Sequence, residues 1–341
     1  MLPRWRGQLE TTGVALVVEG GARLTLARGT APRLRLALAG GSADETPALH
    51  GRAALGALAL AVHCQHEVGP AGRIATHVDA RAVAWSVQGP EALRAARCML
   101  RAEPSAEALR AARAEAVARA EARWDLAWAA RALAPARPGR LAPQGEADAL
   151  RRLPATVVRS WLATARQRAR LSVQGHHPHP DRAARHLLAA LTPLPPGALP
   201  PTPPVPRPAS TRIVAAPAGA DPRRFVLVWG GRRGEPPEPA RMEQLAEALR
   251  ALDVTVIRIR RGVLPGLGPW ASVAAVLRDP AQRRGLPSLL ATAARLASGP
   301  SLRGARWVLP LRPPTRWDHP LALWRPSSPY ASDASRGRHG P

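Results

Sequence analysis

The fold is decided by the stretch RLRLALAGGSADETPALHGRAALGALAL, residues 33–60. Its first part alternates, so that Leu34, Leu36 and Leu38 share one face, which is the period of a half-buried strand. Two glycines and a short polar turn end that strand. The segment 50–62 is rich in Ala and Leu, which predicts a buried helix. A strand, a turn and a buried helix in this order predict a domain in which helices pack on a sheet.

The chain on both sides of this stretch carries the same two periodicities as far as residue 192. Short apolar runs separated by glycine predict strands, and runs rich in Ala, Leu and Arg predict helices. The predicted strands are 14–19, 22–27, 73–79, 82–87 and 170–174, and the predicted helices are 91–101, 105–133, 146–153, 155–168 and 180–191. We therefore predict an α+β fold, with helices packed on a mixed, largely antiparallel sheet.

Nine prolines fall between residues 193 and 208. Pro fixes its own backbone and has no N–H to donate, so a run this dense forms neither a helix nor a sheet interior. We predict a first domain at 1–192, an extended linker at 193–210, a shorter second domain at 211–324 and a disordered tail at 325–341. In the second domain the predicted strands are 212–216, 225–229, 254–260 and 307–311, and the predicted helices are 238–252 and 286–296.

The charge is strongly positive. The 341 residues include 49 Lys+Arg and 24 Asp+Glu, which gives a formal net charge of +25, and every one of the cations is Arg. A high pI is the usual signature of nucleic-acid binding. Because residues with AT-rich codons are scarce and those with GC-rich codons abound, we attribute the charge to the codon usage of a GC-rich bacterium. An Arg-rich nucleic-acid-binding protein stays an alternative.

The Arg-rich segment 105–133 is where such binding would be expected. Its acids Glu107, Glu115 and Glu121 interrupt the positive face of the predicted helix. Glu115 and Arg119 are four residues apart, a spacing that allows an ion pair on a helix surface. We interpret this segment as a solvated helix face.

Composition excludes several classes of protein. No apolar run approaches the roughly 20 residues of a membrane helix, and the apolar run near the N-terminus is too short for a signal peptide. We therefore expect a cytoplasmic protein with no membrane partner. Two cysteines, Cys64 and Cys98, are too few for a disulfide framework. We interpret them as lone buried cysteines, and a nucleophile paired with a distant His is the alternative.

The first candidate metal ligands are His63, His66 and Glu67. A helix face could present all three, but the order His-x-x-His-Glu is neither His-Glu-x-x-His nor His-x-x-Glu-His, the usual zinc-peptidase arrangements. The segment comes just before Gly69 and Pro70, so we expect a solvated loop there.

A second group of histidines follows the predicted strand 170–174. Prolines at 178 and 180 interleave this group, so no single helix face holds its first three members. We interpret it as a polar turn between a strand and a helix, with a metal-binding patch as the alternative. The group consists of His176, His177, His179 and His186.

Taken in order, these features resemble one half of the insulinase/pitrilysin family of zinc metallopeptidases, whose relatives include mitochondrial processing peptidase and the core subunits of cytochrome bc1. The resemblance covers residues 21–196. The pieces that carry it are GGSADE at 40–45 with the helix entry at 51–55, VDARAVAW at 78–85 with the helices after it, and LSVQG at 171–175 with its flanking helices. The proline-rich segment lies where the family joins two homologous halves, so the resemblance implies two related α/β units, the second one shortened.

The resemblance also implies that the zinc motif is lost. Aligning Gly51 with the family's glycine puts Ala54, Ala57 and Leu58 at the positions of the first His, the Glu and the second His. Zinc needs His, Cys or carboxylate ligands, and an activated water needs a base nearby. We therefore predict no metal, no cofactor and no catalysis.

In the family an Arg/Tyr pair in the second half holds the substrate. Here Arg260-Arg261-Gly262 is only faintly similar to that pair, because no Tyr follows it and Trp270 is the nearest aromatic residue. Members without the zinc motif commonly pair with an active chain and help to enclose the substrate. We predict a non-catalytic partner of an active peptidase, in a heterodimer whose Arg-rich wall favours acidic or extended peptides. The alternative is an active zinc peptidase that uses His63, His66 and Glu67.

Overall fold

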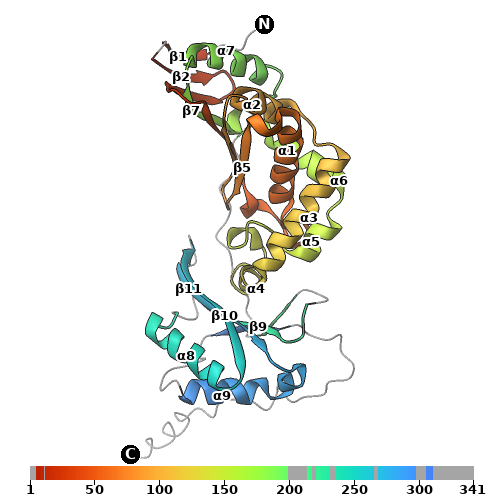
Figure 1. The fold of residues 1–341 in the computed structure, drawn as a ribbon. Coiled ribbons are helices and arrows are strands. Elements are labelled where there is room, and N and C mark those ends of the chain that lie inside the picture. The colour runs from red at the N-terminus through yellow and green to blue at the C-terminus, as the bar shows by residue number, and fades with distance from the viewer. Residues whose placement is uncertain are drawn as a thin grey trace, which may run out of the picture. The chain divides into compact units, whose positions relative to one another are not determined.

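The computed structural model describes residues 5–10, 12–198, 213–216, 220–230, 236–264, 268–296 and 305–309 (Figure 1). These residues form two sheets, one from the chain before the proline-rich segment and one from the chain after it. The predicted linker beyond residue 198 and the predicted tail at 325–341 lie outside the described residues.

The first sheet has seven strands in the order β1-β2-β3-β7-β4-β6-β5. Neighbouring strands are antiparallel except β3 and β7, which run parallel. The predicted mixed, largely antiparallel sheet is therefore confirmed, and β1 is a strand that sequence analysis missed. The strands are β1 (Trp5–Leu9), β2 (Gly13–Val18), β3 (Arg23–Arg28), β4 (Arg33–Ala39), β5 (Arg73–Val78), β6 (Ala82–Gln88) and β7 (Leu171–His177).

One face of this sheet is buried. Leu34, Leu36 and Leu38 of β4 are almost completely enclosed, whereas Arg33 and Arg35 on the opposite face are exposed. This is the alternation expected of a strand with one wet side. The helices whose apolar residues complete this core are α1 (Arg52–Val68), α2 (Ala92–Arg101), α6 (Ala155–Ala165) and α7 (Pro180–Leu191).

The helix predicted at 105–133 is two helices, α3 (Ala106–Ala122) and α4 (Trp124–Leu133). Ser105 caps α3 by accepting a hydrogen bond from the backbone N–H of Ala108 at 3.1 Å. The break falls at Arg123, whose backbone leaves the helical region. Its cause is packing, because α3 buries its apolar stripe against α1 and α5 (Ala147–Arg152) while α4 packs on the second sheet. One straight helix would not serve both surfaces.

The second sheet has five strands in the order β10-β11-β9-β12-β8. Helices α8 (Pro239–Ala251) and α9 (Leu286–Leu296) form a core with one face of it, and α4 covers the other. A strand buried on both faces needs a continuous apolar run rather than alternation. Strand β11 was missed in the sequence for this reason. The strands are β8 (Ile213–Ala215), β9 (Arg224–Gly230), β10 (Val254–Leu264), β11 (Gly268–Leu277) and β12 (Arg306–Leu309).

Helix α1 is longer than predicted, because it continues past residue 62 to Val68. The side chain of Gln65 holds its end in place. The amide nitrogen donates to the carbonyl oxygens of Gly69 and Gly72, at 2.7 and 2.6 Å, and the amide oxygen accepts from the N–H of Ile74 at 3.1 Å. The segment expected to be a solvated loop is therefore the last turns of a helix.

Candidate functional site

A buried carboxylate caps the start of α1. Gly51 is the N-cap residue with φ +94°, a left-handed conformation that other residues rarely adopt. It has no side chain with which to satisfy the free N–H groups of the first turn, so Glu45 does this instead. Its two carboxylate oxygens accept hydrogen bonds from the N–H groups of Gly51 and Ala53, each at 2.7 Å.

Glu45 is completely buried, and this burial raises the pKa of its carboxyl group to about 8. The two backbone hydrogen bonds from Ala53 and Gly51, and the charge of Arg52, act in the opposite direction. Desolvation outweighs them because an ionised carboxylate loses all of its hydration at this position. The start of α1 thus carries a carboxylic acid that holds a proton at neutral pH.

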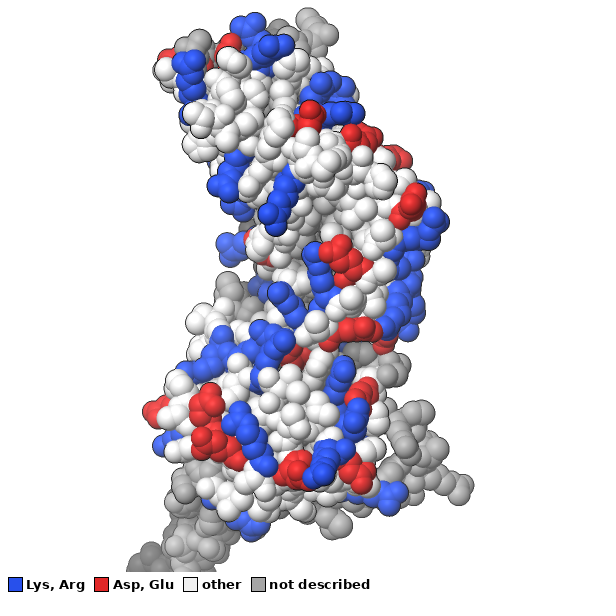
Figure 2. All heavy atoms as spheres, viewed as in Figure 1, with Lys and Arg blue, Asp and Glu red and all other residues white. Residues whose placement is uncertain are grey.

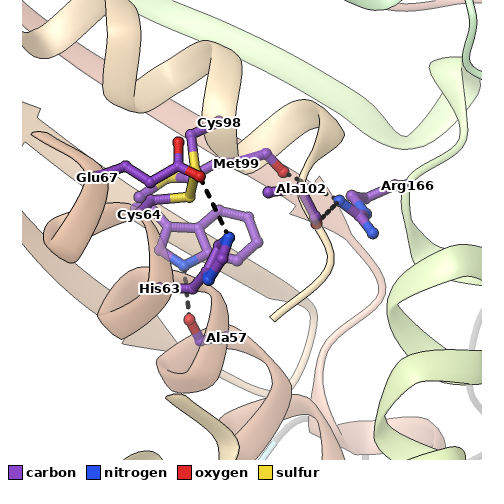
Figure 3. The surroundings of a disulfide bond; sticks show 9 residues. Ala57, His63, Cys64, Glu67, Cys98, Met99, Ala102 and Arg166 are labelled. Carbon is purple, nitrogen blue, oxygen red and sulfur yellow. Dashed lines mark hydrogen bonds and ion pairs between the residues drawn. A yellow bond between two sulfur atoms is a disulfide. The ribbon is translucent and has the colours of Figure 1, made fainter. Parts of the chain in front are cut away.

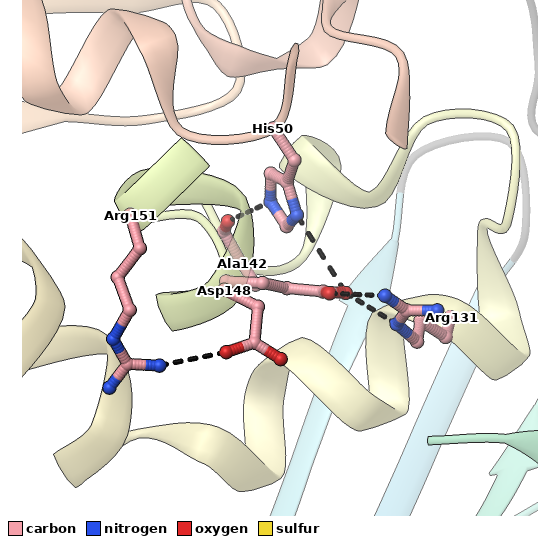
Figure 4. Close-up of polar contacts among 6 residues, drawn as sticks. His50, Arg131, Ala142, Asp148 and Arg151 are labelled. Atoms are coloured by element: carbon pink, nitrogen blue, oxygen red, sulfur yellow. Dashed lines mark hydrogen bonds and ion pairs between the residues drawn. The ribbon is translucent and has the colours of Figure 1, made fainter. Parts of the chain in front are cut away.

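Next to this cap lies a second buried polar group (Figure 4). Nε2 of His50 is 2.7 Å from the carbonyl oxygen of Ala142, and its Nδ1 is 3.9 Å from Oε1 of Glu146. Arg131 grips both carboxylate oxygens of Glu146 from α4, with its Nε at 2.7 Å from Oε1. Burial lowers the pKa of His50, although the Glu146 carboxylate opposes this, so the imidazole is neutral at physiological pH.

Backbone groups and Arg131 hold these polar side chains, and within the described residues they do not form a ligand set for a metal. Both oxygens of Glu45 accept from the backbone, both oxygens of Glu146 accept from Arg131, and Nε2 of His50 faces a carbonyl group. The cluster ties the entry of α1 to the loop before α5 and to α4. Its geometry indicates a structural role.

The residues aligned with the family's zinc motif lie in the first two turns of α1. Ala57 is completely buried and Leu58 nearly so, while Ala54 is partly exposed. The carbonyl oxygen of Ala57 accepts a hydrogen bond from Nε1 of Trp85 at 2.9 Å, and Leu58 belongs to the apolar cluster between α1 and α3. None of these side chains offers an N, O or S ligand, so a zinc ion does not fit this part of the helix.

The other end of α1 brings the two cysteines together with two of the first candidate metal ligands (Figure 3). Cys64 of α1 and Cys98 of α2 form a disulfide bond, so they are not lone cysteines, and neither is free to act as a nucleophile. Nε2 of His63 lies 3.5 Å from a carboxylate oxygen of Glu67, one helical turn on. Within the described residues, the one cluster of possible metal ligands consists of His63, Glu67 and Cys98. His66 is exposed and does not belong to it.

Two clues in the sequence pointed to this corner. Cys64 and Cys98 each lie on the apolar side of an Ala-rich helix, and His63 and Glu67 have the i, i+4 spacing of facing side chains. The spacing of His63 and Glu67 was not interpreted in this way because a loop was expected there. The two cysteines did not predict a bond because the sequence does not show that the two helices touch.

The second histidine group lies where it was expected, between strand β7 and helix α7. His177 ends the strand, and its Nδ1 accepts a hydrogen bond from the backbone N–H of His179 at 3.1 Å. His176, His179 and His186 are exposed. Among the described residues this group does not bring three ligand atoms together, and the interpretation as a polar turn agrees with its geometry.

Arg260, which was compared with the family's substrate-binding Arg, forms an ion pair with Asp125 of α4. It lies on β10 and donates to the carboxylate of Asp125, which is almost completely buried at the start of α4. Arg258 of the same strand lies 3.5 Å from that carboxylate, and Arg261 donates to the carbonyl oxygen of Pro237 at 3.2 Å. Trp270 is buried in the cluster between β11 and α4. These contacts fix the geometry of β10 rather than leave Arg260 open to a ligand.

On the face of the molecule shown in Figure 2, arginine side chains are interspersed with acidic ones. On α3, Arg119 pairs with Glu115 as the spacing predicted, and Arg151 of α5 pairs with Glu121. These pairs interrupt the positive charge of the helix face. None of the helices in the described part of the chain combines the length and the apolar content that a membrane crossing requires.

No protein-family model and no curated protein sequence matches the chain. Solved structures match it. The crystal structure of pitrilysin is 16% identical over 88% of this chain and 39% of its own, with a TM-score of 0.50. That of a peptidase M16 inactive domain from Pseudomonas fluorescens is 16% identical over 87% of this chain and 80% of its own, also with a TM-score of 0.50. The chain has an insulinase/pitrilysin-type fold, and it spans about two fifths of the pitrilysin chain.

Proposed function

We propose that this chain, which has an insulinase/pitrilysin-type fold, is a non-catalytic homologue of the peptidases of that fold and acts as the structural or substrate-enclosing partner of an active zinc peptidase subunit. In this proposal Ala54, Ala57 and Leu58 occupy the positions of the zinc-binding and catalytic residues. The active subunit carries the chemistry, and this chain contributes to the wall around the peptide.

The observation that carries the proposal is the chemistry of the first turns of α1. Their side chains are apolar apart from Arg52, and the nearby Glu45, His50 and Glu146 are buried with hydrogen-bonding or ion-pair partners of their own. A zinc peptidase needs an open metal position with a base beside it. The apolar side chains of these turns and the protonated Glu45 supply neither a metal position nor a base.

A partner role is supported by the likeness to a structure described as an inactive domain of the same peptidase class, of which the match covers 80%. A chain that keeps such a fold without zinc ligands cannot catalyse the reaction, but it can still offer a surface to a partner. The net charge of +25 favours acidic or extended peptides as the material enclosed.

Co-purification from the native host tests the proposal. The tagged chain should bring down, in about equal amount, a protein with a His-x-x-Glu-His helix. Zinc-dependent hydrolysis of an extended acidic peptide by that protein should then rise when this chain is added. Replacing the glutamate of the partner's motif by Gln should abolish hydrolysis while the complex still forms.

An assay of peptide hydrolysis by the purified chain alone can refute the proposal. If it hydrolyses peptides with zinc and loses that activity with a chelator, the partner role is refuted. Loss of that activity in His63→Ala, but not in the structurally matched exposed variant His66→Ala, would place an active site at the end of α1. A steep fall with salt in its binding to random duplex DNA would instead favour the nucleic-acid alternative.

The disulfide bond also bears on the cellular compartment in which the chain works. A cytoplasmic location was predicted, but disulfide bonds persist mainly in oxidising compartments and are rare in the cytosol. The Cys64–Cys98 bond therefore weighs against a strictly reducing compartment. Alkylation of free thiols in freshly lysed native cells measures how much of the chain is oxidised where it works.

A further inference from the structure

The last turns of α1 and the adjoining part of α2 bring three possible zinc ligands together, His63, Glu67 and Cys98, and Cys64 is bonded to the third. With 100° between successive helix positions, residues 63, 64 and 67 fall within an arc of about 100° on α1. Cys98 approaches this arc from α2 and is bonded to Cys64. Figure 3 shows the side chains of His63 and Glu67 turned toward one another beside the two sulfur atoms.

The distances are close to those of a metal site. One ring nitrogen of His63, one carboxylate oxygen of Glu67 and the sulfur of Cys98 all lie within 4.8 Å of one another. Ligands around a tetrahedral zinc ion lie roughly 3.5 Å apart, given metal–ligand bonds of about 2.0–2.3 Å. Binding a zinc ion therefore requires these side chains to rotate toward one another. The side chains of His63 and Glu67 are 21% and 49% exposed, so a metal ion can reach them from solvent.

We propose that reduction of the Cys64–Cys98 bond turns this corner into a zinc site, with Cys64, Cys98, His63 and Glu67 as its ligands. A dithiol supplies two electrons and two protons to the disulfide, which becomes two thiols while the dithiol becomes a disulfide. Each cysteine then gives its thiol proton to solvent as it binds Zn²⁺, and neutral His63 and ionised Glu67 complete the set. Two thiolates, an imidazole and a carboxylate form a tetrahedral donor set that suits zinc.

The scaffold keeps the two sulfur atoms together after reduction. Helices α1 and α2 share one apolar core, to which they contribute several buried side chains besides the two cysteines. Trp85 of β6 donates to the carbonyl oxygen of Ala57 and anchors the second turn of α1 to the sheet. Arg166 donates to the carbonyl oxygen of Ala102 at 2.6 Å and holds the end of α2 (Figure 3). The freed thiols therefore remain beside His63 and Glu67.

This site is separate from the positions that the family uses for zinc. It involves the last turns of α1 rather than the first, and it does not depend on the proposed partner role. The disulfide and the zinc are mutually exclusive, because the same two sulfur atoms make both bonds. Metal content thus follows the redox state of the chain.

Metal binding by the full-length chain tests the proposal. The chain is stripped of metal and divided into an oxidised sample and a sample reduced with a phosphine, and each is titrated with Zn²⁺ against a chromophoric chelator. The reduced sample should bind one zinc ion per chain, and the oxidised sample should bind none at this site. Titration with Co²⁺ should give thiolate-to-cobalt absorption in the reduced sample alone.

Variants separate this corner from other ligands on the chain. His63→Ala and Glu67→Gln should each weaken zinc binding by about tenfold or more, since even residues that only orient a ligand contribute that much. His66→Ala is the matched control, because His66 is exposed on the same turn and lies outside the cluster. Its affinity should equal that of the parent.

Three results would overturn the proposal. They are equal zinc binding by the oxidised and reduced chains, equal affinities of the His63→Ala and His66→Ala variants, and a reduced chain that binds no stoichiometric zinc. Circular dichroism of the reduced chain accompanies each titration. A chain that unfolds on reduction and does not refold when zinc is added also counts against the proposal.

Discussion

The buried acid at the start of α1 makes stability depend on pH in an unusual direction. Glu45 has its pKa raised by burial from 4.5 to about 8. Between these pH values the folded chain holds a proton that the unfolded chain has released, so the free energy of unfolding falls as the pH rises. The slope is about 1.4 kcal/mol per pH unit, and the full effect is about 5 kcal/mol. Below pH 4.5 and above pH 8 this contribution is flat.

Glu45→Gln removes the proton and keeps the shape. The amide oxygen accepts one of the two backbone hydrogen bonds, but the amide nitrogen faces the other N–H group and leaves it unsatisfied, which costs about 1–3 kcal/mol. Near pH 5 the variant should therefore be less stable than the parent by about 1–2 kcal/mol, and at pH 9 it should be more stable by about 2–4 kcal/mol. The two stability curves cross.

Urea denaturation of the oxidised chain, followed by tryptophan fluorescence at several pH values, measures both curves. His50 contributes a slope of the opposite sign in the acid range, because burial lowers its pKa and the unfolded chain binds the extra proton. Both chains share this contribution, so their difference isolates Glu45. Glu243→Gln, at an exposed position on α8, is the control and should run parallel to the parent.

The reasoning fails if the Glu45→Gln curve also runs parallel to the parent curve. It fails equally if the variant becomes relatively less stable as the pH rises. That second result would mean that the carboxylate is ionised in the folded chain, and that the two N–H groups and the helix dipole outweigh its desolvation.

Three further changes test other parts of the structure by the same denaturation assay. Replacing Cys64 and Cys98 together by Ala should lower the free energy of unfolding in metal-free buffer by about 4 kcal/mol, because the bond closes a loop between residues 34 positions apart; an unchanged midpoint would show that the bond is not formed. Asp125→Asn should lower the free energy of unfolding by about 1–3 kcal/mol, because two partly exposed arginines of β10 lose their buried counter-charge. A stability equal to that of the parent would show that these ion pairs do not stabilise the fold. Gly51→Ala should lower the free energy of unfolding by about 1–2 kcal/mol more than Gly69→Ala, the usual cost of overpacking. Both glycines have positive φ, so the strain of a left-handed residue is common to the two variants, but only the new Cβ at 51 meets other atoms at 3.0 Å or less. Equal losses would contradict the crowding at 51.

Much of the fold could be predicted from short-range pattern. The alternation in β4, the buried leucines of α1 and the Glu115–Arg119 pair all depend on residues within a few positions of one another. Such spacing is fixed by the geometry of a strand or a helix, whatever the rest of the chain does. The errors came where a second surface intervened. Strand β11 has no alternation because both of its faces are covered, and the helix predicted at 105–133 breaks to serve two cores.

The chemistry of the candidate sites was decided by tertiary structure. The bond between Cys64 and Cys98 joins two helices 34 residues apart, and Asp125 meets Arg260 across 135 residues. Nothing in the residue types marks Glu45 as an acid that keeps its proton, since its pKa is raised by burial among groups brought in by folding. The amino-acid sequence determined the elements and the absence of zinc ligands at the start of α1. Only the folded chain decided which polar groups meet and lose their water, because solvation depends on every segment packed around a group.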